Sequence, residues 1–525
     1  MGSTPGRKFY RMAPALRSSS VRPHHEAVSI VSALGWGASA RKHAHAENLT
    51  PLHPVHTFKG LDIMDYDFLV LGGGSAGYAA ARTASAAGLK AVVVEGGDEV
   101  GGLCILRGCM PSKAIIASAN CALAIRDAEK FGIQAAPPRV NLPAVIARKR
   151  ELIGEFADYR RGQLEGGKFD FIRGFARLKS PHEVDVATRD GRELTLYARS
   201  ILLSTGSVHA SPPIPGLAEC DALTSDDILD AEELPDSVVI LGAGPVALEM
   251  AHYLDAVGVA VTIIQRSPQF LSGTDPDLAK VVEDAFRARG MRVFVDTQVR
   301  KIQPGERGWE VQFEHGGSVH TVAAERIFNG LGRRPATEGI GLESAGVTAR
   351  KGAVEIANTQ QTNIPHIFAA GDCCGPFEIV HIAIQQGEIA AKNAAALLRG
   401  EEPSERSDYR MKLYAVFTEP QLACVGLGEE EAKSQGIPIR VATHSFEDHG
   451  KSLVLEERDG FVKLVVHADT GEILGGAVVG PHASELIHEV VVAMAFRSTA
   501  AQFAAIPHYH PTLSEIWTYP AEELA

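Results

Sequence analysis

One pattern occurs twice in this chain, and it restricts the possible folds more than any other feature. In each copy an apolar stretch runs into three small residues spaced G-x-G-x-x-G or G-x-G-x-x-A: Gly72, Gly74 and Gly77, then Gly242, Gly244 and Ala247. A second apolar stretch ends 23 positions after the first glycine in both copies (72 to 95 and 242 to 265). This order predicts the strand, turn, helix and strand of a dinucleotide-binding βαβ unit. Two such units predict a relay between two nucleotides.

The two copies end in different residues, and the difference bears on which nucleotide each would bind. The first ends in Glu95, which is suited to accept a hydrogen bond from a ribose hydroxyl. The second ends in Gln265 and Arg266, without a carboxylate at the matching position. An arginine there accommodates a 2′-phosphate, so NADPH is modestly favoured over NADH. The alternative is that Arg266 is a solvated residue at the end of a strand.

Two cysteines, Cys104 and Cys109, are separated by four residues close to the start of a predicted helix. Pro111 suits a first helical turn, and a run of good helix formers follows it. The positive end of a helix dipole favours a thiolate, and Arg107 and Lys113 would add positive charge. This arrangement predicts a reactive dithiol. For an isolated C-x4-C pattern, the alternative is a structural disulfide or two small buried residues.

The composition restricts the classes of function. A chain of 525 residues is too long for one core and predicts two to four domains. A net charge of −13 argues against a general affinity for nucleic acid or for an anionic membrane. No apolar stretch is expected to reach the length of a membrane span. Seven cysteines in so long a chain do not make a secreted disulfide framework, so a reducing compartment is expected.

The segment Gly101–Lys113, with the sequence GGLCILRGCMPSK, closely resembles the redox-active disulfide motif of the class I pyridine nucleotide–disulfide oxidoreductases. The resemblance extends from about residue 64 to about residue 517. It implies an enzyme that passes electrons between NAD(P)H, FAD, a Cys104–Cys109 disulfide and a substrate disulfide or dithiol. In this family Cys104 would meet the substrate, and Cys109 would lie against the flavin. Lys113 would lie near the flavin N5, with Glu249, 136 positions away, as its ion-pair partner.

The resemblance also assigns residues to the two nucleotides, and it implies no metal site. Those assigned to FAD are Gly72, Gly74, Gly77, Glu95, Gly102, Lys113, Thr205, Gly206, Gly371 and Asp372. Those assigned to NAD(P)H are Gly242, Gly244, Ala247, Gln265, Arg266 and Gly332. The NADP-using members commonly have a second arginine where this chain has Ser272. Cys373 and Cys374 follow the second FAD motif directly, and we favour two small buried residues over a soft-metal site.

Near the C-terminus, His510 is the candidate acid–base for thiol exchange, because imidazole can carry a proton near neutral pH. Glu515, five residues on, would hold the ring in one tautomer. The run from His510 to Glu515 matches the family residue by residue. The family's members complete the active site with these two residues from the other subunit. The resemblance therefore implies an obligatory homodimer.

The predicted fold class is α/β, with two Rossmann-like, doubly wound nucleotide-binding domains and a C-terminal α+β dimerisation domain. The predicted boundaries are 64–210 with 335–405 for the FAD-binding domain, 211–334 for the NAD(P)-binding domain and 406–525 for the dimerisation domain. Residues 1–63 are rich in arginine and poor in acids, which suits a transit peptide or an over-extended start. The second interpretation is favoured and predicts a cytoplasmic protein; a transit peptide would direct it to the mitochondrial matrix.

Three members of the family compete as models for the substrate. Mercuric reductases end in a vicinal cysteine pair, which this C-terminus lacks. Glutathione reductases share some substrate contacts with this chain but differ at two positions. The shared positions are Ser75, Arg82 and Tyr159, and the departures are Glu388 and Pro245.

Dihydrolipoyl dehydrogenases fit His381, the acid at Glu388 and the spacing of His508 and His510, although Gln265 and Arg266 depart from an NAD-using site. We therefore predict a dihydrolipoyl dehydrogenase first. The alternatives are an NADPH-dependent reductase of glutathione or another small disulfide, a mercuric reductase-like enzyme, and a flavoprotein that binds or senses without reducing disulfides. The last is least favoured, because both cysteines of the dithiol motif and His510 are present.

Overall fold

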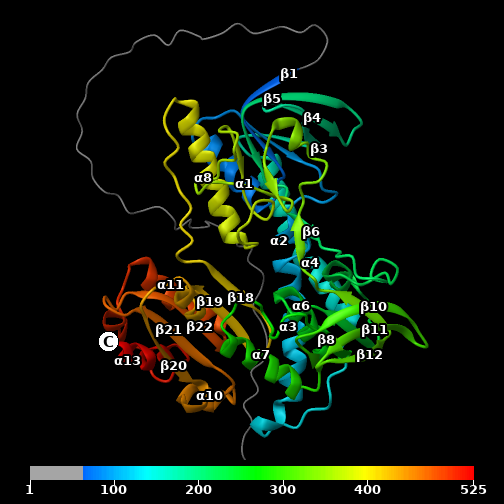
Figure 1. Ribbon diagram of the computed structural model, residues 1–525, viewed down its shortest axis with the longest axis vertical. Helices are drawn as coiled ribbons and strands as arrows, with labels where there is room; N and C mark the ends of the chain where they lie inside the picture. Colours follow the sequence, from blue (N-terminus) through cyan, green and yellow to red (C-terminus); the bar gives the residue numbers. More distant parts are fainter. Residues whose placement is uncertain (1–62) are drawn as a thin grey trace, which may run out of the picture. The chain divides into compact units, whose positions relative to one another are not determined.

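The computed structural model describes residues 63–525 (Figure 1). The predictions for the N-terminal extension therefore lie outside the described residues, apart from Ile63. A mostly parallel mixed sheet and a parallel sheet, each with helices, are followed by an antiparallel sheet with its own helices. The predicted fold class is confirmed.

The first glycine pattern lies in a six-stranded sheet. Its strands are β1 (Ile63–Leu71), β2 (Ala91–Glu95), β3 (Asp170–Leu178), β4 (Glu183–Thr188), β5 (Glu193–Leu203) and β17 (Ile367–Ala369). β1 pairs in parallel with β2 and β5, and β17 pairs in parallel with β5. β4 is antiparallel to both β3 and β5. The first βαβ unit therefore forms as predicted, with the glycine turn between β1 and α1 (Ser75–Ala86).

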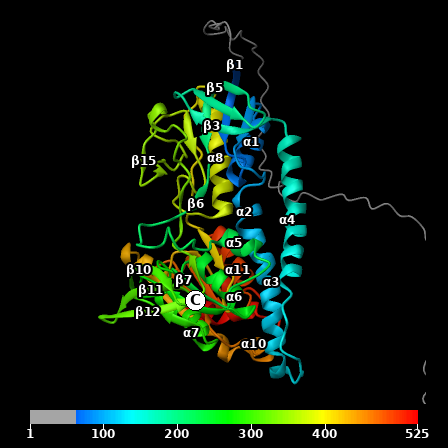
Figure 2. The ribbon, with the colours of Figure 1, turned by 90° about the vertical axis from the view of Figure 1, so that its right-hand side faces the viewer.

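Helix α1 packs closely against α8 (Val380–Leu398), which lies beside it in Figure 1. A Cβ atom on Gly387 of α8 would lie 2.3 Å from the Ala76 carbonyl oxygen, so the helices approach this closely only because that position is glycine. The insertion after β2 contains α2 (Leu103–Leu106), α3 (Cys109–Arg126), the 3-10 turn η1 (Ala128–Phe131) and α4 (Leu142–Glu165). Figure 2 shows α3 and α4, which pack against each other.

The second glycine pattern lies in a parallel sheet of order β13-β7-β8-β9. Its strands are β7 (Ser237–Leu241), β8 (Ala260–Ile264), β9 (Arg292–Phe294) and β13 (Arg326–Asn329). The helices of this part are α5 (Ser225–Asp230), α6 (Pro245–Ala256) and α7 (Pro276–Ala288). An antiparallel sheet completes it: β10 (Gln298–Gly305), β11 (Gly308–His315) and β12 (Ser318–Ala324).

After this unit the chain returns to the first one. β14 (Arg333–Pro335) pairs with β6 (Ser207–His209), and β17 then joins β5 of the first sheet. Between them lie η2 (Glu343–Ala345), β15 (Ala349–Arg350) and β16 (Ala353–Val354). The pairing brings Gly371 and Asp372 to the carboxyl ends of β1 and β5.

The C-terminal part is a five-stranded antiparallel sheet of order β18-β19-β22-β21-β20. Its strands are β18 (Leu413–Val416), β19 (Gln421–Gly426), β20 (Ile439–Ser445), β21 (Phe461–His467) and β22 (Ile473–Gly480). Its helical segments are α9 (Glu429–Ser434), η3 (Phe446–Asp448), α10 (Gly450–Leu455), α11 (Ala483–Ala495), α12 (Ala500–Ala504), η4 (Ser514–Trp517) and α13 (Thr518–Leu524). Trp517 is fully buried, and its indole nitrogen donates to the Leu486 carbonyl at 3.0 Å.

One helical stretch, Leu103–Arg126, is long and apolar enough to cross a membrane when judged by length and composition alone. The expectation that no stretch reaches that length is therefore wrong. The stretch is α2 and α3, and α3 packs against α4 and α6 with Ile115, Ile116 and Ala119 buried. This packing accounts for the apolar composition.

Candidate active site

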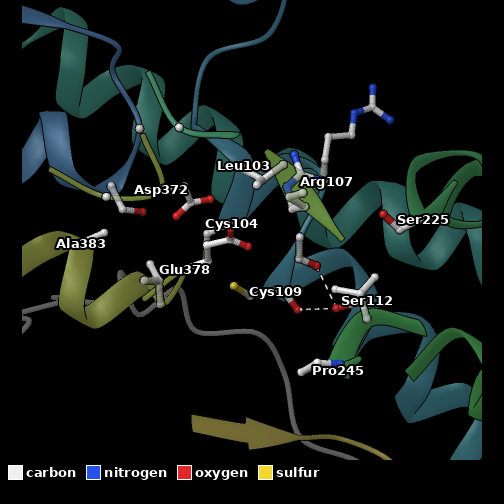
Figure 3. Close-up of a pocket in the computed structure, with 18 of the residues that line it drawn as sticks. Leu103, Cys104, Arg107, Cys109, Ser112, Ser225, Pro245, Asp372, Glu378 and Ala383 are labelled. Atoms are coloured by element: carbon white, nitrogen blue, oxygen red, sulfur yellow. Dashed lines mark hydrogen bonds between the residues drawn. The ribbon is translucent and has the colours of Figure 1, made fainter. Parts of the chain in front are cut away.

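A cavity of about 300 Å³ lies where the first and second glycine units meet the dithiol segment. Figure 3 shows the two cysteines in its wall, with Asp372 and Glu378 on one side and Ser112 and Pro245 on the other. The cavity is also lined by Gly74, Lys113 and Glu249 and by Ala415 of β18. Segments far apart in the sequence thus converge on the dithiol.

The two cysteines lie on consecutive helical segments. Cys104 is in α2, and Cys109 is the first residue of α3, with Arg107 and Gly108 between the helices. Both are thiols here and are half-buried. The pKa of the Cys109 thiol is lowered to about 7, first by a hydrogen bond from Cys104 and then by the charge of Lys113. The same hydrogen bond, with burial, raises the pKa of the Cys104 thiol. Cys109 therefore holds the negative charge in the reduced pair.

The predicted ion pair between Lys113 and Glu249 is present. Lys113 Nζ donates to Glu249 Oε1 and Oε2 at 2.8 and 2.7 Å, and the Glu249 side chain is only 6% exposed. Glu249 Oε1 also accepts from the Phe417 backbone N–H at 3.1 Å, and Lys113 Nζ lies 4.5 Å from the centre of the Phe417 ring. One lysine thus connects all three parts of the chain beside Cys109.

Arg107 does not take the role that the sequence predicts. Its guanidinium donates to Asp230 at 2.6 Å and to Glu99 at 2.9 Å. Asp230 also accepts from Lys149 at 2.6 Å. The charge of Arg107 is therefore neutralised by two carboxylates, and we assign it to joining the dithiol segment to α5. Asp230 and Lys149 were not identified from the sequence, because no local pattern marks them.

The glycines predicted for FAD let backbone segments pack closely around the first glycine turn, and we call this turn with Gly102 the cradle. A Cβ atom on Gly72 would lie 2.4 Å from the Ser204 carbonyl oxygen, and one on Gly77 would lie 1.9 Å from the Gly72 carbonyl oxygen. Gly102 has a positive φ of 77°, and a Cβ atom there would lie 2.6 Å from Gly74 Cα. The dithiol segment and the first glycine turn therefore touch backbone to backbone.

Polar groups around this cradle also fit FAD. The buried Thr205 hydroxyl has no hydrogen-bond partner among residues 63–525, so a ligand could satisfy it. Gly206 has the positive φ of 72° and lines the cavity. Glu95 accepts from the backbone N–H groups of Gly73 and Gly97 at 2.7 and 2.6 Å, which fixes its carboxylate at the end of β2.

At the second FAD motif, the N–H of Gly371 donates to Gln386 Oε1 at 2.7 Å, and Asp372 accepts from the Ser207 hydroxyl at 2.6 Å. The cradle, the unpaired hydroxyl and the cavity beside Cys109 all suit a flavin dinucleotide. Bound there, FAD would supply two-electron exchange between a nicotinamide and the dithiol.

The second glycine turn has the geometry of a further nucleotide site. Gly242 has a φ of 99°, and a Cβ atom there would lie 2.4 Å from the Gly330 carbonyl oxygen, whereas Gly244 faces open space. Gly332 has a φ of 96° with open space around it. Gly330 was missed from the sequence: a Cβ atom on it would lie 2.7 Å from Ala247 Cβ. A glycine directly after β13 is the signal that could have found it.

The residues at the end of β8 differ in exposure. Gln265 is buried, and its Nε2 donates to the Gln269 carbonyl at 3.3 Å and to Ser272 Oγ at 3.5 Å. Arg266 is exposed and forms no ion pair with any residue of 63–525. Ser272 Oγ donates to Ser267 Oγ at 2.8 Å. The loop after β8 therefore offers one unpaired cation and several hydroxyl groups.

His510 and Glu515 form the predicted pair. Nδ1 of His510 lies 2.9 Å from Glu515 Oε2 and 3.1 Å from Oε1, so the carboxylate selects the tautomer that leaves Nε2 free. Glu515 is buried, and the His510 side chain is 76% exposed. His510 does not line the cavity that contains Cys104. Its own chain therefore does not bring this ring to the dithiol.

The remaining candidates are placed as follows. Arg82 pairs with Glu388 at 2.9 Å across α1 and α8, and Tyr159 and His381 are exposed.

Cys373 and Cys374 are buried in the core beneath the first sheet, and the Cys373 thiol donates to the Leu203 carbonyl at 3.3 Å. This supports two small buried residues rather than a soft-metal site. No group of three or more histidine, cysteine or acidic side chains in residues 63–525 could hold a metal ion.

The sequence pattern of the pyridine nucleotide-disulphide oxidoreductases matches residues 66–387, more than half of the chain. The chain belongs to this family. The dimerisation domain of the same family matches residues 413–521. The dithiol and the two glycine turns lie within the first match, and His510 and Glu515 lie within the second.

Curated relatives cover nearly the same residues. The chain is 36% identical over 459 residues to dihydrolipoyl dehydrogenase of Chlamydia trachomatis, across 87% of this chain and 96% of that protein. It is 34% identical over 464 residues to dihydrolipoyl dehydrogenase of Bacillus subtilis, across 86% of this chain and 96% of that protein.

Two solved structures are also similar. LpdA from Mycobacterium tuberculosis gives a TM-score of 0.78 at 28% identity and covers 88% of this chain and 100% of that one. The HOCl-induced flavoprotein disulfide reductase RclA from Escherichia coli gives 0.75 at 25% identity and covers 87% of this chain and 99% of that one.

Proposed function

We propose that this oxidoreductase is a dihydrolipoyl dehydrogenase, which oxidises a protein-bound or free dihydrolipoyl dithiol and delivers the electrons to a nicotinamide. The observation that carries the proposal is the thiolate-stabilising site at Cys109, completed by the Lys113–Glu249 ion pair. Similarity to dihydrolipoyl dehydrogenases over most of the chain supports it.

The residues of this chain support a balanced exchange. His510 of a second copy takes a proton from one substrate thiol, and that sulfur attacks Cys104 in the Cys104–Cys109 disulfide. The disulfide bond breaks, and Cys109 leaves as a thiolate beside Lys113. His510 releases this first proton to solvent and then takes the proton of the second substrate thiol, whose sulfur attacks the substrate sulfur bound to Cys104. Cys104 leaves and takes one proton back, so the substrate is oxidised by two electrons, the dithiol is reduced and one proton is released.

The position of His510 supports a dimer as the active form. The ring is exposed and lies off the cavity that contains its own Cys104. The chain carries the family's dimerisation domain, in which His510 and Glu515 both lie. A second copy of this chain would supply the acid–base to the first.

For the nucleotide, we propose NADPH modestly over NADH. The position that would hold a ribose-binding carboxylate is Gln265, whose amide is already bonded to its own loop. The neighbouring Arg266 is exposed and has no ion-pair partner within 63–525, so it is available for a 2′-phosphate.

A second candidate, a reductase of a small anionic disulfide, is favoured by one observation. The guanidinium of Arg160, on α4, lies 4.2 Å from the centre of the Tyr78 ring, and its charge favours the thiolate of Cys104. Its Nε is buried without a hydrogen-bond partner in the described part of the chain, and burial lowers the pKa of Arg160. An unpaired cation beside the thiol that meets the substrate suits a disulfide with a carboxylate, whereas lipoamide is neutral.

The experiment compares NADH and NADPH with lipoamide, glutathione disulfide and Hg(II) as acceptors in steady state. Turnover of lipoamide supports the first proposal, and the preferred nucleotide tests Arg266. A preference for glutathione disulfide would favour the second candidate over the first. This preference should be lost in Arg160→Met and kept in the surface variant Arg161→Met. Turnover of neither disulfide would contradict both.

A further inference from the structure

A second histidine lies behind the His510–Glu515 pair. His449 is fully buried, follows η3 and precedes α10. Its Nε2 lies 3.5 Å from Glu515 Oε1, and its Nδ1 lies 2.9 Å from Ser452 Oγ. Ser452 is also fully buried. The carboxylate that holds the ring of His510 is therefore also approached, at Oε1, by a second imidazole.

The partners of His449 determine which of its nitrogens carries the proton. An ionised carboxylate only accepts hydrogen bonds, so Nε2–H facing Glu515 is favourable and a bare Nε2 lone pair there is not. The hydroxyl of Ser452 can either donate or accept. Nδ1 of His449 therefore accepts from Ser452, and Nε2–H is directed at Glu515. Serine, histidine, carboxylate and histidine form a chain in which each group orients the next.

The charged groups around His449 favour its neutral form. Burial lowers the pKa of His449; Glu515 acts against this, and His444 and His510 act with it. His444 lies on β20, with its ring stacked at 3.9 Å on Tyr519 of α13. The neighbouring carboxylates on η3, Glu447 and Asp448, are exposed. Nε2 of His449 is buried without a hydrogen-bond partner among residues 63–525, and the carboxylate oxygen 3.5 Å away is Glu515 Oε1. Neutral His449 thus directs an N–H toward Glu515 without adding a charge to the pair.

We propose that His449 is a positioning residue for the acid–base step: through Glu515 it fixes the ring of His510 and limits how strongly the carboxylate holds the proton there. The inference rests on the proposed function, because it assigns His510 as the acid–base. A donor to Glu515 spreads the negative charge of the carboxylate, so less of it acts on His510. Without that donor, His510 holds its proton more tightly and works as a base only at higher pH.

The test uses His449→Phe, which keeps the ring size and removes the donor, and His449→Gln, whose amide can still donate to Glu515. In dihydrolipoamide oxidation, we expect the acid limb of the kcat/KM profile to move upward by about half to one pH unit in the Phe variant. The Gln variant should return it toward the wild-type position. At pH values above the acid limb KM should change little, because His449 is buried and does not line the cavity that contains the dithiol.

The matched control is His444→Phe. This change also removes an imidazole close to Tyr519, but His444 has no ring nitrogen within 4.0 Å of the Glu515 carboxylate, whereas Nε2 of His449 lies 3.5 Å from it. It should leave the acid limb in place. An unchanged limb in His449→Phe, or an equal shift in His444→Phe, would overturn the proposal. If His449→Phe does not fold, His449→Met carries the same test, because its side chain is apolar and flexible and has no N–H to direct at Glu515.

A second measurement separates this inference from the proposed function. The rate of carbethoxylation of His510 by diethyl pyrocarbonate is followed against pH by peptide mass spectrometry, without turnover. The midpoint for His510 should be higher in His449→Phe than in wild type; an identical midpoint would overturn the role of His449. Absence of dihydrolipoamide oxidation in the wild type would contradict the proposed function alone.

Discussion

Replacing Glu515 by Gln tests the acid–base assignment most sharply, because the change removes one charge and few atoms. The two atoms that matter, His510 Nδ1 and Glu515 Oε2, are 2.9 Å apart. A pair of unit charges at this separation interacts by about 1.4 kcal/mol in water and by about 6 kcal/mol at an effective dielectric constant of 20. Because the His510 side chain is 76% exposed, the lower value is the better guide.

A loss of about 1.4 kcal/mol corresponds to a factor of about 10 in the proton affinity of the ring. Dihydrolipoamide oxidation needs the unprotonated ring, so the acid limb of kcat/KM should move downward by about one pH unit in Glu515→Gln. The plateau should fall by about 100-fold or more, because a neutral amide no longer selects the tautomer and the base is weaker. The assay is the initial rate of nucleotide reduction between pH 5 and 9.

Glu489→Gln is the matched control. Glu489 Oε2 lies 2.9 Å from Nε2 of His508, so it forms the same kind of pair two residues from His510. This variant should keep the wild-type profile. The reasoning is refuted if Glu515→Gln keeps both the acid limb and the plateau, or if Glu489→Gln changes them equally. The shift is opposite in direction to the one expected for His449→Phe.

Three further changes test other parts of the site. Cys104→Ser should lose disulfide exchange but keep a hydroxyl donor to Cys109, so a long-wavelength charge-transfer absorbance should remain. This absorbance should fade as the pH falls through about 7. Absence of the band at pH 8 would reverse the assignment of the two cysteines. Arg266→Glu should lower the ratio of kcat/KM for NADPH over NADH by about 10-fold, and an unchanged ratio would make this arginine a solvated strand end. Gly102→Ala places a Cβ atom 2.6 Å from Gly74 Cα, on a residue with a positive φ. The Tm should therefore fall, and less FAD should be retained on gel filtration. Wild-type values of both would contradict the close approach.

The parts of the fold that local patterns encode could be predicted from the sequence. The two βαβ units follow from apolar stretches and glycine spacing, and β8 ends at Ile264, one residue before the predicted end of its apolar stretch at Gln265. The Lys113–Glu249 pair, although 136 positions apart, was predicted because each residue has a fixed place in a recognisable motif. The His510–Glu515 pair was predicted for the same reason.

The contacts that the sequence did not reveal depend on the tertiary fold alone. Arg107 was expected to favour a thiolate, but α5 brings Asp230 to it from 123 positions away. The place of Gly330 directly after β13 is a local signal, but only the fold shows that Ala247 packs against it. His449 and Ser452 lie in a short segment without a motif, and only the tertiary fold brings His449 within 3.5 Å of Glu515, 66 positions away.

The central claim is that Cys104 and Cys109 form a redox pair in electronic contact with FAD. An anaerobic titration of the oxidised holoenzyme with dithionite, followed by flavin absorbance, tests it most directly, with Cys109→Ser as the control. We predict that wild type takes up about two electrons per FAD before the flavin absorbance is lost, and that the control takes up none. Loss of flavin absorbance from the first addition in the wild-type protein would contradict the account.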